Sequence, residues 1–170
     1  NYHDYGYGVT VDTSGNVFVT GATARGLEEG TSEVNNNPDA YLLKYNSSGT
    51  KQWTKQLSRG SYAIYTSYAY DVTTDSSGNA YVTGRIYGSL DGGSYYGVSD
   101  MLLMKYNTSG TRLWSKVLGT SGNDYGEGVA VDSSNNIYVT GYTEDGLDGN
   151  SSAGEGDIFL VKYNSSGTKQ

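Results

Sequence analysis

The sequence predicts an all-β fold of three similar antiparallel sheets, because three series of segments recur in the same order along the chain. The first series joins an aspartate turn to a strand-like stretch, the second is a short apolar run that ends in Lys-Tyr, and the third is an asparagine turn. They occupy residues 11–21, 74–84 and 131–141; 39–45, 100–106 and 157–163; and 45–52, 106–113 and 163–170. Self-similarity at this spacing indicates three tandem structural units.

Each unit contains four segments expected to form strands, and the first unit illustrates them. Residues 5–12 are rich in Tyr, Gly and Val, and residues 16–21 alternate with the period of two that a strand requires. The apolar run 40–43 is typical of a strand that is covered on both faces. Residues 50–57 mix charged side chains with Trp and Leu, as expected of a half-exposed outer strand.

The segments between these strands carry the residues of tight turns. An Asp or Asn opens each turn and can accept hydrogen bonds from the amides that follow it. Gly15 and Gly78 occupy the place in the aspartate turn where a left-handed backbone is expected, and Asn135 replaces them in the third unit. Asn tolerates this conformation better than most residues, so we expect the same hairpin in all three units.

Four-stranded antiparallel units in tandem are the blades of a β-propeller. The third unit, with VAVDSSNNIYVTG, LDGN, DIFLVKY and NSSGTKQ, resembles the bacterial β-propeller repeat called SBBP, and the resemblance extends over nearly the whole chain. The first unit departs from the pattern in its loop, residues 26–39. The resemblance implies a ring of many blades in a secreted or cell-surface setting, and it implies no defined activity.

The predicted blades cover residues 1–57, 58–118 and 119–170, and the third lacks most of its outer strand. A propeller needs at least about four blades to close, so blade faces are left without a neighbour. The chain is then either part of a longer repeat protein, or identical chains complete one another by strand addition. The expected partners are therefore neighbouring blades or identical chains.

Composition narrows the classes of function. The net charge of -7 argues against nucleic-acid binding, and no apolar run approaches the roughly 20 residues of a membrane span. The chain has no cysteine and a single histidine, His3, which argues against a zinc site of the usual ligands. No signal peptide is evident in the sequence.

The sequence predicts that the protein is not an enzyme. The first strands of the units offer mostly Val, Thr, Gly and Tyr, whereas an active propeller needs ionisable groups near its axis. Carboxylate pairs do occur, at Asp124 with Glu127 and at Glu144 with Asp145. They leave open a glycan-active hydrolase or lyase as the less favoured alternative. Lys44, Lys105 and Lys162, which end the apolar runs, are expected to be solvated charges.

A second alternative is a module stabilised by calcium. Calcium prefers carboxylate, amide and backbone oxygens, and such side chains gather in the loop of the third unit between its second and third strands. The predicted ligands are Asp145, Asp148, Asn150 and Asp157. In the competing interpretation, Asp39, Asp100 and Asp157 instead begin the third strands by accepting hydrogen bonds from loop amides.

Loops rich in Tyr, Ser and Gly are the predicted partner surface, because Tyr offers a large contact area at low entropic cost. The candidate residues are Tyr62, Tyr65, Tyr87, Tyr95 and Tyr96. Tyr is also a favoured strand residue, which accounts for part of its abundance. We therefore expect a structural, adhesive or self-assembling scaffold that binds protein or glycan.

Overall fold

The computed structural model describes residues 3–24, 27, 37–57, 66–90 and 96–170. Within these residues the chain forms three antiparallel sheets with strands in chain order, which confirms the predicted all-β blades. The first sheet comprises β1 (Asp4–Val11), β2 (Val17–Thr23), β3 (Asp39–Tyr45) and β4 (Lys51–Gln56); the second comprises β5 (Thr66–Thr74), β6 (Ala80–Tyr87), β7 (Asp100–Tyr106) and β8 (Arg112–Leu118); the third comprises β9 (Asp124–Val131), β10 (Ile137–Thr143) and β11 (Asp157–Tyr163).

The third sheet has three strands, as the sequence predicts, and a single β-bridge follows its last strand. Tyr163 pairs with Lys169 in a single antiparallel bridge, in the way that Tyr45 pairs with Lys51 in the first sheet. The only helical element among the described residues is the 3-10 turn η1 (Leu147–Gly149). The described part of the chain therefore contains no helix with the length and apolar character of a membrane span.

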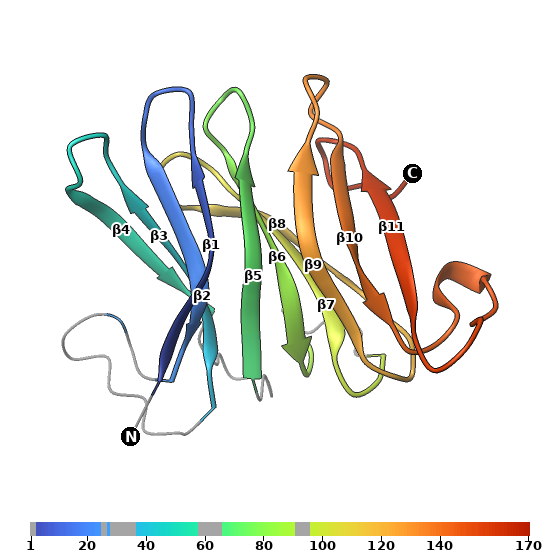
Figure 1. The fold of residues 1–170 in the computed structure, drawn as a ribbon. Coiled ribbons are helices and arrows are strands. Elements are labelled where there is room, and N and C mark those ends of the chain that lie inside the picture. Colours follow the sequence, from blue (N-terminus) through green and yellow to red (C-terminus); the bar gives the residue numbers. More distant parts are fainter. Residues whose placement is uncertain (1–2, 25–26, 28–36, 58–65, 91–95) are drawn as a thin grey trace.

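The three sheets stand side by side in chain order, with their first strands β1, β5 and β9 next to one another (Figure 1). β5 packs against β2 and β3 of the first sheet, and β9 packs in the same way against β6 and β7 of the second. The first strands of the second and third sheets thus pack on a face of the sheet before them. The outer strand β4 lies away from this inner row, at the left of Figure 1.

The hairpin turns have the predicted conformation. Asp12 accepts hydrogen bonds through Oδ1 from the amides of Ser14 and Asn16, both at 2.9 Å. Gly15 has a φ of 78°, and Asn135 at the corresponding place in the third sheet has a φ of 60°. The exchange of Gly for Asn therefore preserves the turn.

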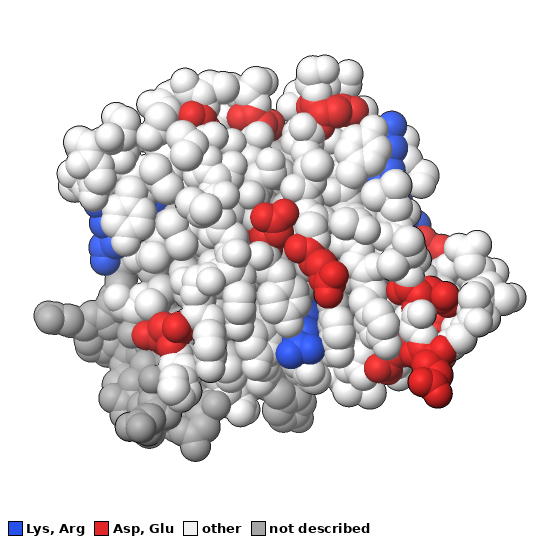
Figure 2. Space-filling view, in the orientation of Figure 1, with Lys and Arg blue, Asp and Glu red and all other residues white. Residues whose placement is uncertain are grey.

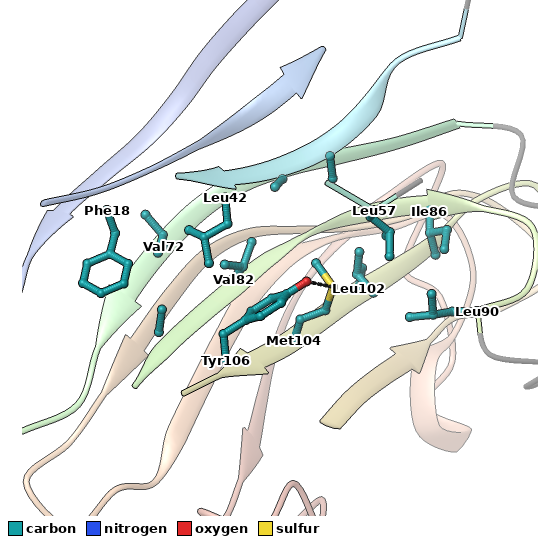
Figure 3. Packing of buried hydrophobic residues seen from close by; sticks show 13 residues of the cluster. Phe18, Leu42, Leu57, Val72, Val82, Ile86, Leu90, Leu102, Met104 and Tyr106 are labelled. Atoms are coloured by element: carbon teal, nitrogen blue, oxygen red, sulfur yellow. Dashed lines mark hydrogen bonds between the residues drawn. The ribbon is translucent and has the colours of Figure 1, made fainter. Parts of the chain in front are cut away.

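Apolar side chains gather into two core clusters, and each cluster fills one junction between sheets. At the first junction Phe18 and Leu42 face Val72 and Val82 (Figure 3). At the second junction Met101 and Leu103 of β7 join residues of the third sheet. All seven residues of β7 are buried, which agrees with the prediction for a continuous apolar run. Full burial of one such side chain contributes roughly 1.5–3 kcal/mol, so the junctions dominate the stability of the fold.

Side chains of the first sheet also form hydrogen bonds with the following sheet. Lys44 Nζ and Trp53 Nε1 both donate to the backbone carbonyl oxygen of Thr108, at 3.1 and 3.2 Å. Lys105 Nζ donates to the carbonyl oxygen of Ser165 in the third sheet, at 3.3 Å. The expectation of solvated charges is wrong for Lys44 and Lys105, because both are buried and each binds a hairpin turn of the next sheet.

A glycine in the second strand of every sheet allows the first strand to pass close by. A Cβ atom at Gly84 would lie closer than 3.0 Å to the carbonyl oxygen of Tyr68, and the same holds for the equivalent glycines of the other two sheets. The register of β5 and β6 shifts at this point, between Ala69 and Asp71. The Val-Thr-Gly repeat thus reflects the irregular pairing of the innermost strand.

We predict that Gly84→Ala lowers the free energy of unfolding by about 3 kcal/mol or more, because the new methyl group overlaps the backbone of β5. Urea unfolding monitored by circular dichroism measures this change. Gly154→Ala is the matched control, since a Cβ atom at Gly154 meets nothing within 4 Å, and its effect should stay within about 0.5 kcal/mol. Equal free energies of unfolding for the two variants would contradict the close approach of the β5 backbone to Gly84.

Candidate functional site

Aromatic side chains from all three sheets form one continuous surface along the row of first strands. We call this surface the tyrosine face. It consists of Tyr5 and Tyr7 of β1, Tyr68 and Tyr70 of β5, Tyr87 of β6, Tyr125 of β9 and Tyr142 of β10, together with Arg85 of β6. Tyrosines two residues apart point to the same side of a strand, and so the Tyr-x-Tyr pattern of β1 and β5 places its rings together.

The rings contact one another within and between sheets. Tyr5 stacks on Tyr7 with their centroids 5.9 Å apart, and Tyr68 stacks on Tyr70 at 6.0 Å. The edge of one pair meets the face of the other where Tyr7 contacts Tyr70 at 5.5 Å. Aromatic pairs prefer stacked and edge-to-face geometries of this kind. The tyrosine face therefore spans the junction between the first and second sheets without a break.

Arg85 lies at the centre of this surface. Its guanidinium carbon is 4.6 Å from the ring centroid of Tyr68 and 4.7 Å from that of Tyr125, and Tyr87 and Tyr70 follow at 5.3 and 5.8 Å. A guanidinium over aromatic rings is attracted by their electron-rich faces. Tyr125 belongs to the third sheet, so its contact with Arg85 extends the tyrosine face across the second junction.

Burial favours the neutral form of two phenols of the tyrosine face. Burial raises the pKa of Tyr70, although the charge of Arg85 acts in the opposite direction. Burial also raises the pKa of Tyr7, and the neighbouring phenols of Tyr68 and Tyr5 add to this effect. The tyrosine face therefore presents aromatic rings and hydroxyl groups around the partly buried guanidinium of Arg85.

A carboxylate near the tyrosine face holds two first strands together. Asp71 Oδ1 accepts a hydrogen bond from the amide of Val72 at 2.8 Å, and Asp71 Oδ2 accepts one from the amide of Val129 on β9 at 2.9 Å. Both oxygens are thus occupied by backbone donors. Asp71 stands where the other sheets have Gly8 and Gly128, and it stabilises the second junction.

The candidate carboxylates for a glycan-active hydrolase or lyase also join loops to one another. Glu144 Oε2 accepts from the amide and the side chain of Asn123, at 2.9 and 2.8 Å. Asp145 Oδ2 accepts from Ser121 Oγ at 2.6 Å. Asp124 is buried and accepts from the amide and the hydroxyl of Thr120. These contacts give three of the four candidate carboxylates a structural role, and the fourth, Glu127, is exposed.

All four predicted calcium ligands line one pocket of about 330 Å³, beside β11. Each of them nevertheless has another partner. Asp148 forms an ion pair with Lys169, and Asn150 Nδ2 donates to the carbonyl oxygen of Leu147 at 2.9 Å. Asp145 binds Ser121, as described above. Within the described ranges, no three Asp, Glu, His or Cys side chains are grouped to hold a metal ion. Calcium binding stays a prediction that the shared pocket supports and these contacts weaken.

Hydrogen bonds to loop amides are present at two of the strand-starting aspartates. Asp157 Oδ2 accepts from the amide of Ala153 at 2.8 Å, and Asp100 Oδ2 accepts from that of Tyr96 at 3.1 Å. Asp39 Oδ2 accepts a hydrogen bond from the side chain of Gln56 on β4 at 3.0 Å. For Asp100 and Asp157 these contacts favour the competing interpretation, in which the aspartates fix the start of a strand.

The predicted partner residues fall in different places. Tyr87 belongs to the tyrosine face, and Tyr96 lies outside it with 50% of its surface exposed. Tyr62, Tyr65 and Tyr95 lie outside the described residues. The tyrosines of the first strands are not among the predicted partner residues. The signal that could have found them is the alternating Tyr-x-Tyr pattern, because tyrosines two residues apart share one side of a strand.

Charge on this side of the molecule is predominantly acidic. Figure 2 shows acidic side chains over the turns at the top, in the middle and at the lower right, where the loop with η1 lies, whereas basic side chains are few. This distribution agrees with the net charge of -7. Such a surface disfavours nucleic acid as a partner.

Comparisons with known proteins agree with the fold. The family model described as SBBP, a β-propeller repeat, matches residues 1–25, 52–91 and 113–148, which together make up more than half of the chain. An uncharacterized WD repeat-containing protein of Acanthamoeba polyphaga mimivirus is 28% identical over 227 aligned residues. The alignment covers 98% of this chain, and the chain spans 16% of the length of that relative.

Proposed function

The chain belongs to the SBBP β-propeller repeat family, and from this premise we propose that it is a non-catalytic scaffold that binds a protein through the tyrosine face. Its setting in this proposal is secreted or at the cell surface. The observation that carries the proposal is the continuous row of tyrosines around Arg85. Fold alone does not supply a function, so the proposal depends on this surface.

The carboxylates support a role without catalysis. Asp71 lies beside the tyrosine face, yet both of its oxygens accept backbone hydrogen bonds. Glycoside hydrolysis needs two carboxyl groups that face the substrate, one of which gives or takes a proton. Glu127 is exposed, and Asp71 is already committed to the junction. The glycan-active hydrolase or lyase therefore remains the less favoured alternative.

The exposure of the tyrosine face supports recognition of a partner. Tyr5 and Tyr7 are each 45% exposed, although both rings stack on neighbours. Tyr and Arg are enriched among the residues that carry binding energy at protein interfaces, and a Tyr ring loses little conformational freedom on binding. Rings held by stacking lose even less. A protein segment with apolar and hydrogen-bonding groups suits this surface, and a glycan is the alternative ligand.

We predict that peptides selected from a displayed library on the immobilised chain bind Tyr7→Ala at least about tenfold more weakly than wild type. The matched control is Tyr96→Ala, which removes a tyrosine of similar exposure outside the tyrosine face. Biolayer interferometry measures both affinities. Two outcomes contradict the proposal: peptides that lose affinity on Tyr96→Ala instead, or a glycan array that gives Tyr7-dependent binding while no peptide does.

Calcium stabilisation is the second candidate, and the pocket shared by the predicted ligands favours it. We predict that millimolar calcium raises the Tm of wild type and that Asp148→Ala abolishes this gain. Lys169→Ala is the matched control, because it removes the same ion pair and retains the carboxylate. Differential scanning fluorimetry measures the shifts. No gain in wild type, or an equal gain in all three proteins, would contradict calcium binding at this loop.

A further inference from the structure

The third sheet exposes a face that the other two sheets bury. Ile158 and Leu160 of β11 are 92% and 73% exposed. Their counterparts in the first and second sheets, at the same places in the repeat, are Ala40 with Leu42 and Met101 with Leu103, and all four are buried in the core clusters. The difference arises because β5 covers β3 and β9 covers β7, whereas no described strand covers β11. We call this exposed side of the third sheet the rear face.

The first sheet exposes the complementary face. Val9 and Val11 of β1 are 68% and 58% exposed. The counterparts of Val9 are Val72 and Val129, which are buried at the first and second junctions. Val131, the counterpart of Val11, packs against the second core cluster. We call this side of the first sheet the front face. It carries the residue types that elsewhere in the chain pack against β3 and β7.

The hairpin turns that precede the fourth strands show the same difference. Gly110 and Gly167 are buried, and a Cβ atom at either would contact the indole ring of Trp53 or Trp114 in the preceding sheet. Gly49 holds the same place in the first sheet. It is exposed, and among the described residues nothing lies within 4 Å of the position that its Cβ would take. Among the described residues, the turn of the first sheet therefore lacks the packing partner that its two counterparts have.

The lysine contacts extend this complementarity to hydrogen bonding. Lys44 and Lys105 donate to the carbonyl oxygens of Thr108 and Ser165, each in the turn of the following sheet. Lys162 is the counterpart of these lysines on β11, where it lies over the ring of Tyr138 at 5.5 Å. Ser47 is the counterpart of the two acceptors, in the exposed turn of the first sheet. Donor and acceptor thus lie on opposite faces of the same molecule.

We propose that the rear face of one molecule binds the front face of a second copy of this chain, in the arrangement that joins the sheets within each chain. Ile158 and Leu160 then pack against Val9 and Val11 of the second copy, and Lys162 donates to the Ser47 carbonyl. Two internal junctions already display this interface with residues at the equivalent places of the repeat, so the occupant is a copy of the repeat itself. The inference does not depend on the ligand of the tyrosine face.

The two faces are different surfaces, so the contact is head-to-tail and not two-fold symmetric. Such an interface leads to a closed ring when the rotation between copies closes, and to an open chain when it does not. Association also covers the pocket that Ile158 and Leu160 help to line. Both faces are exposed in the single molecule, so substitutions there should leave its own core clusters intact.

Sedimentation velocity over a range of concentrations tests the proposal on the whole chain. Wild type is expected to associate reversibly, and Leu160→Asp is expected to weaken association by about a hundredfold or more, because it would bury an uncompensated charge. Leu113→Asp is the matched control, since Leu113 is a half-exposed leucine on β8, away from both faces. Circular dichroism verifies that both variants are folded. A wild type that stays monomeric, or two variants that associate equally, would overturn the proposal.

A mixing experiment tests the head-to-tail geometry. Val9→Asp disables the front face and Leu160→Asp disables the rear face, so each variant alone should be monomeric. A mixture of the two retains one intact interface and is expected to form a one-to-one dimer. No dimer in the mixture, or dimers of either variant alone, would overturn the assignment of the two faces.

Discussion

The packing of one sheet face on the next is the interaction on which the rest of this structure depends. A single four-stranded sheet of this sequence cannot bury its own apolar residues, because its third strand carries them on both sides. β7 buries all of its residues because it lies between two neighbouring sheets. β11 has the same kind of sequence, yet it leaves Ile158 and Leu160 in solvent. Burial in this fold is thus a property of the junction rather than of the strand.

The same packing determines where the tyrosine face lies. When each sheet rests on the one before it, the first strands β1, β5 and β9 adjoin, and side chains that are distant in sequence meet. Tyr7 then contacts Tyr70, and Arg85 reaches Tyr125 across the second junction. Asp71 binds the Val129 amide across the same junction. A surface for a partner and the contacts that hold the sheets together are therefore built from the same strands.

The sequence alone predicts the features that repeat within a unit. The strands, the turns and the left-handed Asn135 follow from local chemistry, and the structure confirms them. The sequence predicts poorly the contacts that a residue makes with the next unit. Lys44 was expected in solvent because its acceptor, Thr108, lies 64 residues away. Arg85 gave no signal because Ala22 and Tyr142 replace it in the other units, and a residue without a counterpart is invisible to the repeat. Asp145, Asp148, Asn150 and Asp157 line one pocket, but their spacing in the sequence could not reveal their separate partners.

The most direct test of junction packing compares one substitution at equivalent places in two sheets. Urea unfolding at concentrations at which the chain is monomeric gives the free energies of unfolding of Leu103→Ala and Leu160→Ala. If burial comes from the neighbouring sheet, Leu103→Ala should cost about 2–5 kcal/mol, as expected of a core leucine, and Leu160→Ala less than about 0.5 kcal/mol, as expected of a surface position. Similar losses in the two variants would show that each sheet buries its apolar residues by itself, and they would contradict this account.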